Sequence, residues 1–194
     1  MKTTGFFWGR FNPPHKGHVE IIRRILRQVD DLIVVIGASQ NKNTKSNPFS
    51  GEERKQMLEA YLKEEELDEK VKIIPLPDSE VSIQDAVRYV LNNTPKFDVS
   101  FSTHEIEEQL TPIKIEVEKT LEQELNKRKI KIVKFRRMGT LSSSKIREAI
   151  AYDKKWEYMT GKSVVRIIKE LNGIERIKKA HNSSYTQSKR KRKG

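Results

Sequence analysis

The sequence predicts an α/β fold in which helices cover both faces of an open parallel sheet. Short apolar runs alternate along the chain with longer segments whose apolar residues recur every three or four positions. The short runs are rich in β-branched and aromatic residues, as buried strands are. Because strands and helices alternate, we expect right-handed crossovers around the sheet, a Rossmann-like architecture that ends in a C-terminal helical segment.

Five segments have the composition of strands. Residues 3–8 form a short apolar run that contains Phe6, Phe7 and Trp8. Residues 32–36 are apolar at every position, which is typical of a strand buried on both faces. The other three predicted strands are 71–76, 97–101 and 130–135.

Helical patterns fill the intervals between these strands and continue after the last one. We predict helices that start near Val19 and that cover about 51–66, 81–91 and 105–129. The last of these has one apolar stripe with a spacing of four: Ile113, Val117, Leu121 and Leu125. Beyond Arg147 the pattern stays helical to residue 177, with an interruption at Gly173.

A polar segment separates the second strand from the second helix. Residues 38–50 are rich in Asn, Ser and Lys, and we predict a mobile loop over the carboxyl edge of the sheet. Ser50 is a suitable N-cap for the helix that follows. Glu53, three residues later, completes a capping box.

Length and charge predict one folded domain with a basic tail. The chain has 194 residues and a net charge of +12, which suits anionic substrates such as nucleotides. We assign 1–180 to the domain and predict that 181–194 is a disordered basic tail, because it has little apolar content. This tail either makes weak contacts with nucleic acid or other phosphates, or merely adds solubility.

Several classes of protein are excluded or disfavoured. The chain has no cysteine, which excludes disulfides, thiol catalysis and thiolate metal sites. We see no signal peptide and no apolar run long enough to span a membrane, and therefore expect a cytoplasmic protein without membrane contact.

The first motif with chemical content lies between the first strand and the first helix, at residues 9–18. A strand, a tight turn and a helix in succession aim the helix N-terminus at an anion. Gly17 lets a phosphate approach the backbone, and Arg10 and Lys16 add positive charge. His15 and His18 share a helical face and both suit donation to phosphate oxygens.

A second phosphate motif lies at residues 141–147, before the first C-terminal helix. Ser142, Ser143 and Ser144 supply a helix cap, free backbone N–H groups and hydroxyl donors. Arg147 adds a guanidinium that binds phosphate with two hydrogen bonds. The serines alone would also serve as ordinary caps, so the phosphate role depends on Arg147 and on the first motif.

Alternative readings of these residues are structural or metal-binding. The two motif histidines also fit a fragment of a metal site, but the chain contains only two others, His104 and His181. We therefore favour phosphate donors and expect no protein metal site. Phe11 and Phe49 either line a nucleotide pocket or pack in the core, and Trp156 favours packing.

Both motifs resemble those of a known enzyme superfamily. G-R-F-N-P-P-H-K-G-H at residues 9–18 resembles the H-x-G-H signature of nucleotidyltransferases, and L-S-S-S-K-I-R resembles their I-S-S-T-x-x-R motif, with Ser144 in place of Thr. N-P-F-S-G-E-E-R, Trp156 and the ending V-V-R-I-I-K-E-L-N-G-I-E-R-I complete a set. Together they are similar to the archaeal-type nicotinamide-nucleotide adenylyltransferases.

This resemblance implies an activity and a set of site residues. Enzymes of this type transfer AMP from ATP, with Mg²⁺, to nicotinamide or nicotinic acid mononucleotide, and they commonly form homo-oligomers. Carried over by position, the residues with catalytic roles are His15, His18 and Arg147. Those that bind ATP are Gly9, Arg10, Phe11, Lys16, Gly17, Ser142, Ser143 and Ser144.

The sequence departs from the family pattern in two regions. Ser46 stands where the family usually has an Arg two positions before the Pro. The Asn and Trp of the family's nicotinamide pocket are absent from 79–87, where Ser82 and Asp85 lie roughly at their places. Two alternatives therefore stay open: a nucleotidyltransferase with another phosphorylated acceptor, and a non-catalytic protein that binds nucleotide or RNA.

Overall fold

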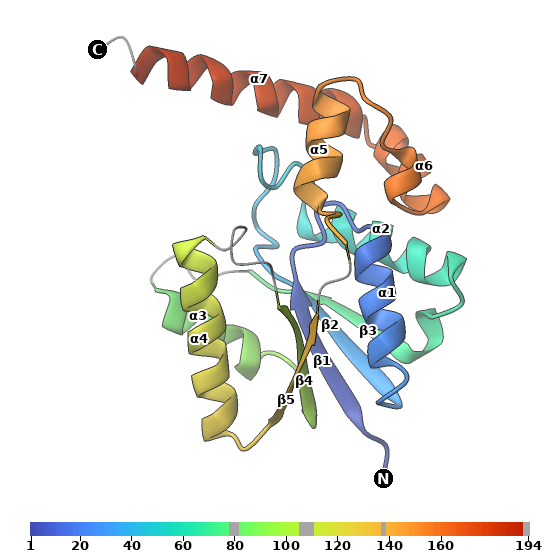
Figure 1. Ribbon diagram of the computed structural model, residues 1–194, viewed down its shortest axis with the longest axis vertical. Coiled ribbons are helices and arrows are strands. Elements are labelled where there is room, and N and C mark those ends of the chain that lie inside the picture. Colours follow the sequence, from blue (N-terminus) through green and yellow to red (C-terminus); the bar gives the residue numbers. More distant parts are fainter. Residues whose placement is uncertain (78–81, 105–110, 137–138, 192–194) are drawn as a thin grey trace.

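The computed structural model describes residues 1–77, 82–104, 111–136 and 139–191. They form a five-stranded sheet in the order β3-β2-β1-β4-β5, and all neighbouring strands are parallel (Figure 1). The strands are β1 (Thr4–Gly9), β2 (Asp31–Ile36), β3 (Val71–Pro75), β4 (Val99–His104) and β5 (Lys131–Arg136). The predicted open parallel sheet is confirmed, and each predicted strand overlaps an observed one, with bounds that differ by at most three residues.

Helices cover both faces of this sheet. They are α1 (Lys16–Ile25), α2 (Gly51–Glu64), α3 (Ile83–Asn92) and α4 (Pro112–Lys127). Helices α1 and α2 pack on one face, whereas α3 and α4 pack on the other (Figure 1). Alternate strand residues serve the two cores: Phe7 packs with α1 and α2, and its neighbour Phe6 packs with the α3 side.

The C-terminal helices build a third core above the carboxyl edge of the sheet. They are α5 (Ser143–Ala151), α6 (Lys162–Glu170) and α7 (Gly173–Lys191), with a short 3₁₀ turn, η3, at Glu157–Met159. Their apolar faces pack on α2 and the start of α1 (Figure 1). Trp156 is buried in this core, as the packing interpretation predicts. The C-terminal segment therefore closes over the ends of the strands.

Helix α4 differs from its predicted form. It begins at Pro112, whereas the predicted helix starts at 105, and residues 105–110 lie outside the described residues. Leu125 is buried, but Ile113 is 63% exposed. The predicted apolar stripe is wrong at its first position, because α3 pairs with the C-terminal half of α4, through Arg88 with Glu124.

Helix α7 also extends beyond its predicted length. The sequence analysis predicts disorder from residue 181, whereas the helical backbone continues to Lys191. No glycine or proline lies between Ile174 and Lys193, so no residue in this stretch opposes a helical backbone. Within the described ranges, no helix combines the length and the apolar character that crossing a membrane requires.

Candidate functional site

The two phosphate motifs lie at the carboxyl edge of the sheet, where the strand order reverses. The chain runs from β1 outward to β3 and then returns to place β4 on the other side of β1. The turn after β1 therefore lies at the switch point, which is where open α/β sheets bind ligands. This position agrees with the sequence prediction for residues 9–18.

The turn at residues 12–14 connects the two motifs. Each of its three successive carbonyls accepts a hydrogen bond from the C-terminal part of the chain: Asn12 from Arg147 Nη1 at 2.7 Å, Pro13 from Ser143 Oγ at 2.8 Å and Pro14 from Thr160 Oγ1 at 2.8 Å. The N-termini of α1 and α5 are thereby held side by side. The structure brings together two motifs that are about 130 residues apart in the sequence.

The two motif histidines form one stacked unit at the start of α1. His15 is the N-cap and His18 the third helical residue, and their rings stack with centroids 3.6 Å apart. The backbone N–H of His15 donates to Nδ1 of His18 at 3.1 Å. A neutral His18 therefore carries its proton on Nε2, which makes that nitrogen a donor. His15 is buried, and His18 is half-buried.

Glycine at position 17 makes room for this pair of rings. A Cβ at Gly17 would lie 3.1 Å from two atoms of the His15 ring. The prediction for Gly17 concerned the approach of a phosphate to the backbone; the structure adds a second reason, because His15 packs across it. Lys16, at the first helical position, is exposed.

Phe11 supports the histidines from inside the core. Its side chain is 1% exposed and its ring centroid is 4.6 Å from that of His18. A Cβ at Gly9 would lie 2.9 Å from the Phe11 ring, so only glycine leaves space for it. Phe49 is also fully buried. The structure therefore places both phenylalanine rings in the core, which is the packing alternative of the sequence analysis.

Arg147 is the cation of the second motif that contacts the first motif. It donates to the carbonyls of Asn12 and Lys45 and to Ser144 Oγ. Partial burial, together with the nearby charge of Arg10, lowers the pKa of Arg147 to about 10. The hydrogen-bond partners that the described part of the chain gives Arg147 are all neutral oxygens. Arg147 thus experiences the positive charge of Arg10 and has no carboxylate among these partners, which suits an anionic ligand.

The three motif serines have different neighbours. Ser142 is the N-cap of α5, where its Oγ accepts from the N–H of Lys145 at 3.2 Å. Ser143 binds the 12–14 turn, and Ser144 Oγ accepts from Arg147 at 3.2 Å. Ser142 therefore has the capping role that the sequence predicts. Ser143 and Ser144 connect α5 to the 12–14 turn and to Arg147.

Two more residues lie near Arg147. Lys45, in the 38–50 loop, adds positive charge, and His181 lies on α7, where its ring packs against Tyr152, the C-cap of α5. Partial burial and the charges of Lys45 and Arg147 lower the pKa of His181 below its usual value. Sequence reasoning did not place His181 near the site, because nothing in the pattern fixes where α7 lies.

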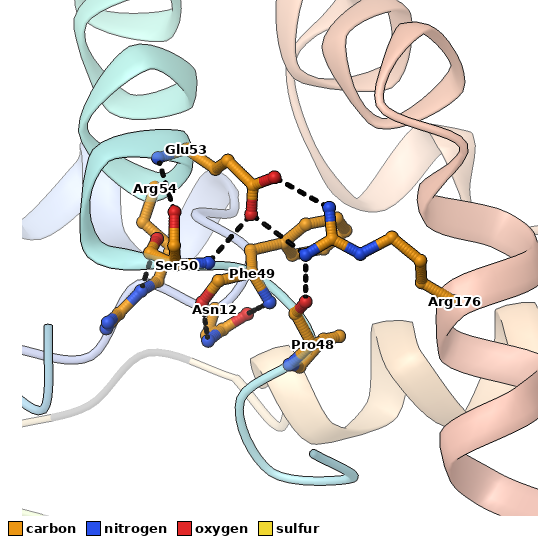
Figure 2. Close-up of polar contacts among 7 residues, drawn as sticks. All are labelled: Asn12, Pro48, Phe49, Ser50, Glu53, Arg54 and Arg176. Atoms are coloured by element: carbon orange, nitrogen blue, oxygen red, sulfur yellow. Dashed lines mark hydrogen bonds and ion pairs between the residues drawn. The ribbon is translucent and has the colours of Figure 1, made fainter. Parts of the chain in front are cut away.

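The 38–50 loop is anchored on the site, which differs from the predicted mobile loop. Asn47 and Phe49 are buried, and the turn 44–47 closes on itself through Thr44 Oγ1, which accepts from the N–H of Asn47 at 2.9 Å. The side chain of Asn12 binds both the N–H and the carbonyl of Phe49, at 3.3 and 3.1 Å (Figure 2).

Arg54 is a fully buried site residue that sequence reasoning missed. Its guanidinium donates to four carbonyls, those of Arg10, Gly37, Ala38 and Ser50, at 2.8–3.0 Å. It therefore holds the ends of β1 and β2 and the start of α2. A signal did exist, because Arg54 lies at helical spacing from Met57, Leu58 and Tyr61 on the buried face of α2.

The region expected to hold the acceptor is described in part. Residues 78–81 lie outside the described residues. Ser82 is the N-cap of α3; its Oγ accepts from the N–H of Asp85 at 3.0 Å and donates to the Asp85 carboxylate at 2.6 Å. Ser82 and Asp85, which lie roughly at the places of the family's Asn and Trp, thus bind each other at the N-terminus of α3.

Comparison with known proteins identifies relatives over nearly the whole chain. A family model described as cytidylyltransferase-like matches residues 6–149. The "Nicotinamide-nucleotide adenylyltransferase" of Thermococcus kodakarensis is 36% identical over 179 residues, which cover 92% of this chain and 88% of the relative. The protein of the same name from Pyrococcus horikoshii is 36% identical over 174 residues, 90% of this chain and 87% of that one.

A solved structure shares the fold. It is a bifunctional NMN adenylyltransferase/ADP ribose pyrophosphatase from Francisella tularensis, complexed with AMP and a manganese ion. The two superpose with a TM-score of 0.77 at 19% identity, over 100% of this chain and 57% of that one. At this level of identity the likeness concerns the fold.

Proposed function

We propose that this chain, which belongs to the cytidylyltransferase-like family, transfers the adenylyl group of ATP to nicotinamide (or nicotinic acid) mononucleotide, which forms NAD and releases pyrophosphate. The observation that carries this proposal is that two helix N-termini meet at the 12–14 turn, where Arg147 binds the carbonyl of Asn12. Helix N-termini and guanidinium groups are the two features that bind phosphate chains most readily. Archaeal relatives named for this reaction support it.

The proposed reaction needs positioning more than proton transfer. An oxygen of the acceptor phosphate bonds to the α-phosphorus of ATP, the bond from that phosphorus to the bridging β-oxygen breaks, and pyrophosphate leaves with the electron pair. The acceptor phosphate is already ionised at neutral pH, so no general base is required. Catalysis then consists of holding the two anions in line and neutralising charge in the transition state.

Each motif has a role in this scheme. The α1 N-terminus and Nε2 of His18 donate to the phosphates near the reacting phosphorus, next to the stacked ring of His15. Arg147 holds the β- and γ-phosphates and stabilises the departing pyrophosphate, with Ser142, Ser143 and Ser144 at the start of α5. Arg10, Lys16, Gly9 and Gly17 shape the first turn of the site, and Phe11 supports it from the core.

We also propose Mg²⁺ as a companion of the triphosphate. Within the described ranges, no three His, Cys, Asp or Glu side chains gather into a group that would hold a metal ion. The ion would therefore be held by phosphate oxygens and water, which is a common arrangement for Mg²⁺ at nucleotide sites.

Other phosphorylated acceptors, in place of nicotinamide or nicotinic acid mononucleotide, form the second candidate function. The observation that favours them is the Ser82–Asp85 pair, which replaces the family's Asn and Trp and is engaged in capping α3. A non-catalytic role is less well supported, because both phosphate motifs are intact and brought together.

Release of pyrophosphate from ATP with a panel of acceptors tests these options. We expect turnover with nicotinamide or nicotinic acid mononucleotide, measured by a coupled pyrophosphate assay. Turnover only with another phosphorylated compound would support the second candidate. No release with any acceptor, despite ATP binding, would leave a binding protein.

Three further expectations also stay proposals: location in the cytoplasm, assembly into a homo-oligomer, and weak nucleic-acid contact through 181–194. Light scattering tests the assembly. For the tail, RNA binding should weaken steeply with salt and disappear in a chain truncated after Lys178.

A further inference from the structure

The C-terminal helix makes a fork-shaped contact with the loop that precedes α2. Arg176 of α7 binds both carboxylate oxygens of Glu53, Nη1 at 2.6 Å and Nη2 at 3.0 Å. Its Nη2 also donates to the carbonyl of Pro48 at 2.6 Å, and its guanidinium lies 5.3 Å from the centre of the Phe49 ring (Figure 2). One side chain therefore holds a carboxylate, a carbonyl and a ring of the same segment.

The Glu53 end of this contact is itself fixed. Glu53 closes the capping box of α2, where its carboxylate accepts from the N–H of Ser50 at 2.7 Å (Figure 2). Burial alone raises the pKa of Glu53, but hydrogen bonding to Arg176 and Ser50 outweighs it and lowers the pKa below the usual value. Arg176 thus binds a charged carboxylate that the start of α2 holds in place, so α7 is joined to a rigid point.

The segment that Arg176 holds is connected to both backbone acceptors of Arg147. The first is the carbonyl of Lys45, which accepts from Nε at 3.0 Å and belongs to the closed turn 44–47, directly before Pro48. The second is the carbonyl of Asn12, whose side chain binds the backbone of Phe49 on both sides. A shift of residues 48–49 would therefore move both acceptors together.

We propose that Arg176 is a positioning residue for ATP binding: it holds residues 48–49 in place, and through them it fixes the guanidinium of Arg147 on the triphosphate. This inference rests on the proposed function, because it assumes that Arg147 binds the β- and γ-phosphates. It gives α7 a role in the site although no residue of α7 belongs to either phosphate motif. Because AMP lacks those two phosphates, its affinity does not depend on Arg176.

The test compares the affinities of ATP, AMP and pyrophosphate for wild type and Arg176→Gln by calorimetry. We expect the variant to bind ATP and pyrophosphate about tenfold more weakly, as for a modest displacement of a positioned group, with AMP affinity unchanged. In steady state the KM for ATP should rise while the KM for the acceptor stays the same. In an Arg147→Ala background, Arg176→Gln should change ATP affinity by less than about twofold.

The matched control is Arg23→Gln. Arg23 forms a comparable partly buried pair with Glu65 at 2.7 Å, but at the other end of α2, away from the site. Arg23 also lies 3.6 Å from Glu20, so Arg23→Gln removes two Arg–Glu contacts and Arg176→Gln removes one. A purely structural role therefore predicts that Arg176→Gln changes ATP affinity no more than Arg23→Gln does. A loss of native structure would weaken ATP and AMP binding equally, which the ratio of the two affinities detects.

The outcomes separate the inference from the proposed function. Wild-type ATP affinity in Arg176→Gln, or an equal loss for ATP and AMP, overturns the positioning role. So does an effect that persists in full when Arg147 is absent. If the wild-type chain itself binds ATP no more tightly than AMP and releases no pyrophosphate, the proposed function fails instead.

Discussion

Arg54 and Arg147 bind two ends of the segment that joins β2 to α2. Arg54 donates to the carbonyls at the base of this loop, those of Gly37, Ala38 and Ser50. Arg147 donates to the carbonyl of Lys45 near its tip. Each also binds the first motif, Arg54 at Arg10 and Arg147 at Asn12. The Arg54 guanidinium therefore lies at the buried base of this loop, and the Arg147 guanidinium lies at its partly exposed tip. Both contact the same site, and we call these two regions the base and the tip.

The difference between the two lies in burial. Arg54 is fully enclosed and belongs to the framework, whereas Arg147 remains partly exposed beside Arg10. A buried cation that bridges carbonyls contributes mainly to stability, and a half-buried one has donors that a ligand can reach. Substitutions at the base should therefore reduce folding stability, and those at the tip should reduce catalysis.

The largest expected effect is at the base. Arg54→Ala removes the guanidinium donor of four carbonyls, of which those of Ala38 and Ser50 keep a backbone donor, and we expect the free energy of unfolding to fall by about 3–5 kcal/mol. Urea denaturation measures this. Gln56→Ala, an exposed position on the same helix, should change it by less than about 0.5 kcal/mol. A loss below about 1 kcal/mol in Arg54→Ala would refute the framework role.

At the tip, Arg147→Ala should reduce kcat about 10²–10³-fold, as for a lost donor to developing charge. Its unfolding midpoint should stay close to that of wild type, because the residue is partly exposed. Glu148→Ala, at an exposed position of the same helix outside the motif, serves as the control and should retain activity. The base-and-tip distinction fails if Arg147→Ala loses stability as Arg54→Ala does.

His18 belongs to the tip as well, and the expected effect is next in size. His18→Ala removes the Nε2 donor and should lower kcat about 100-fold. Its stacking partner His15 stays in place, so circular dichroism should show an unchanged fold. Near-normal turnover of ATP in this variant would count heavily against phosphate binding by the α1 motif.

The smallest expected effect concerns pH and the contact between Arg176 and Glu53. Because the folded-state pKa of Glu53 is lowered, its contribution to stability is present above the unfolded-state pKa and is lost as pH falls through the folded-state pKa. Wild type should therefore lose more stability than Glu53→Gln as the pH falls below about 4.5. Urea unfolding midpoints at a series of pH values test this, and parallel curves for the two proteins would contradict it.

Much of the framework was accessible from local patterns. The five strands, the alternation with helices and the Ser50–Glu53 capping box follow from period-two, period-3.6 and cap signals, and the structure confirms each. Such signals depend on neighbours within four residues, so a sequence displays them directly. The stripe on α4 failed at Ile113, since burial depends on which distant elements pack against each part of α4, and Arg88 of α3 contacts it at Glu124.

The candidate site also contains residues that local patterns identify and residues that only the tertiary structure places. The histidines, the serines and Arg147 were identified from motifs, and Arg54 could have been found from its place on the buried face of α2. Arg176 could not, because local patterns do not pair it with Glu53, which is 123 residues away, or with the carbonyl of Pro48. Thr160 could not, because its acceptor is a main-chain carbonyl of the 12–14 turn. Every residue has such a carbonyl, so no residue type marks the one that a distant side chain will bind.

By itself, the sequence determined the layered parallel fold, the two helix N-termini and the residue types at them. Only the tertiary structure decided that these N-termini meet at one turn, that the 38–50 loop is anchored, and that α7 reaches the site through Arg176. The reason is physical. Periodicity and caps are properties of adjacent residues, whereas convergence depends on how three separate cores pack against one another.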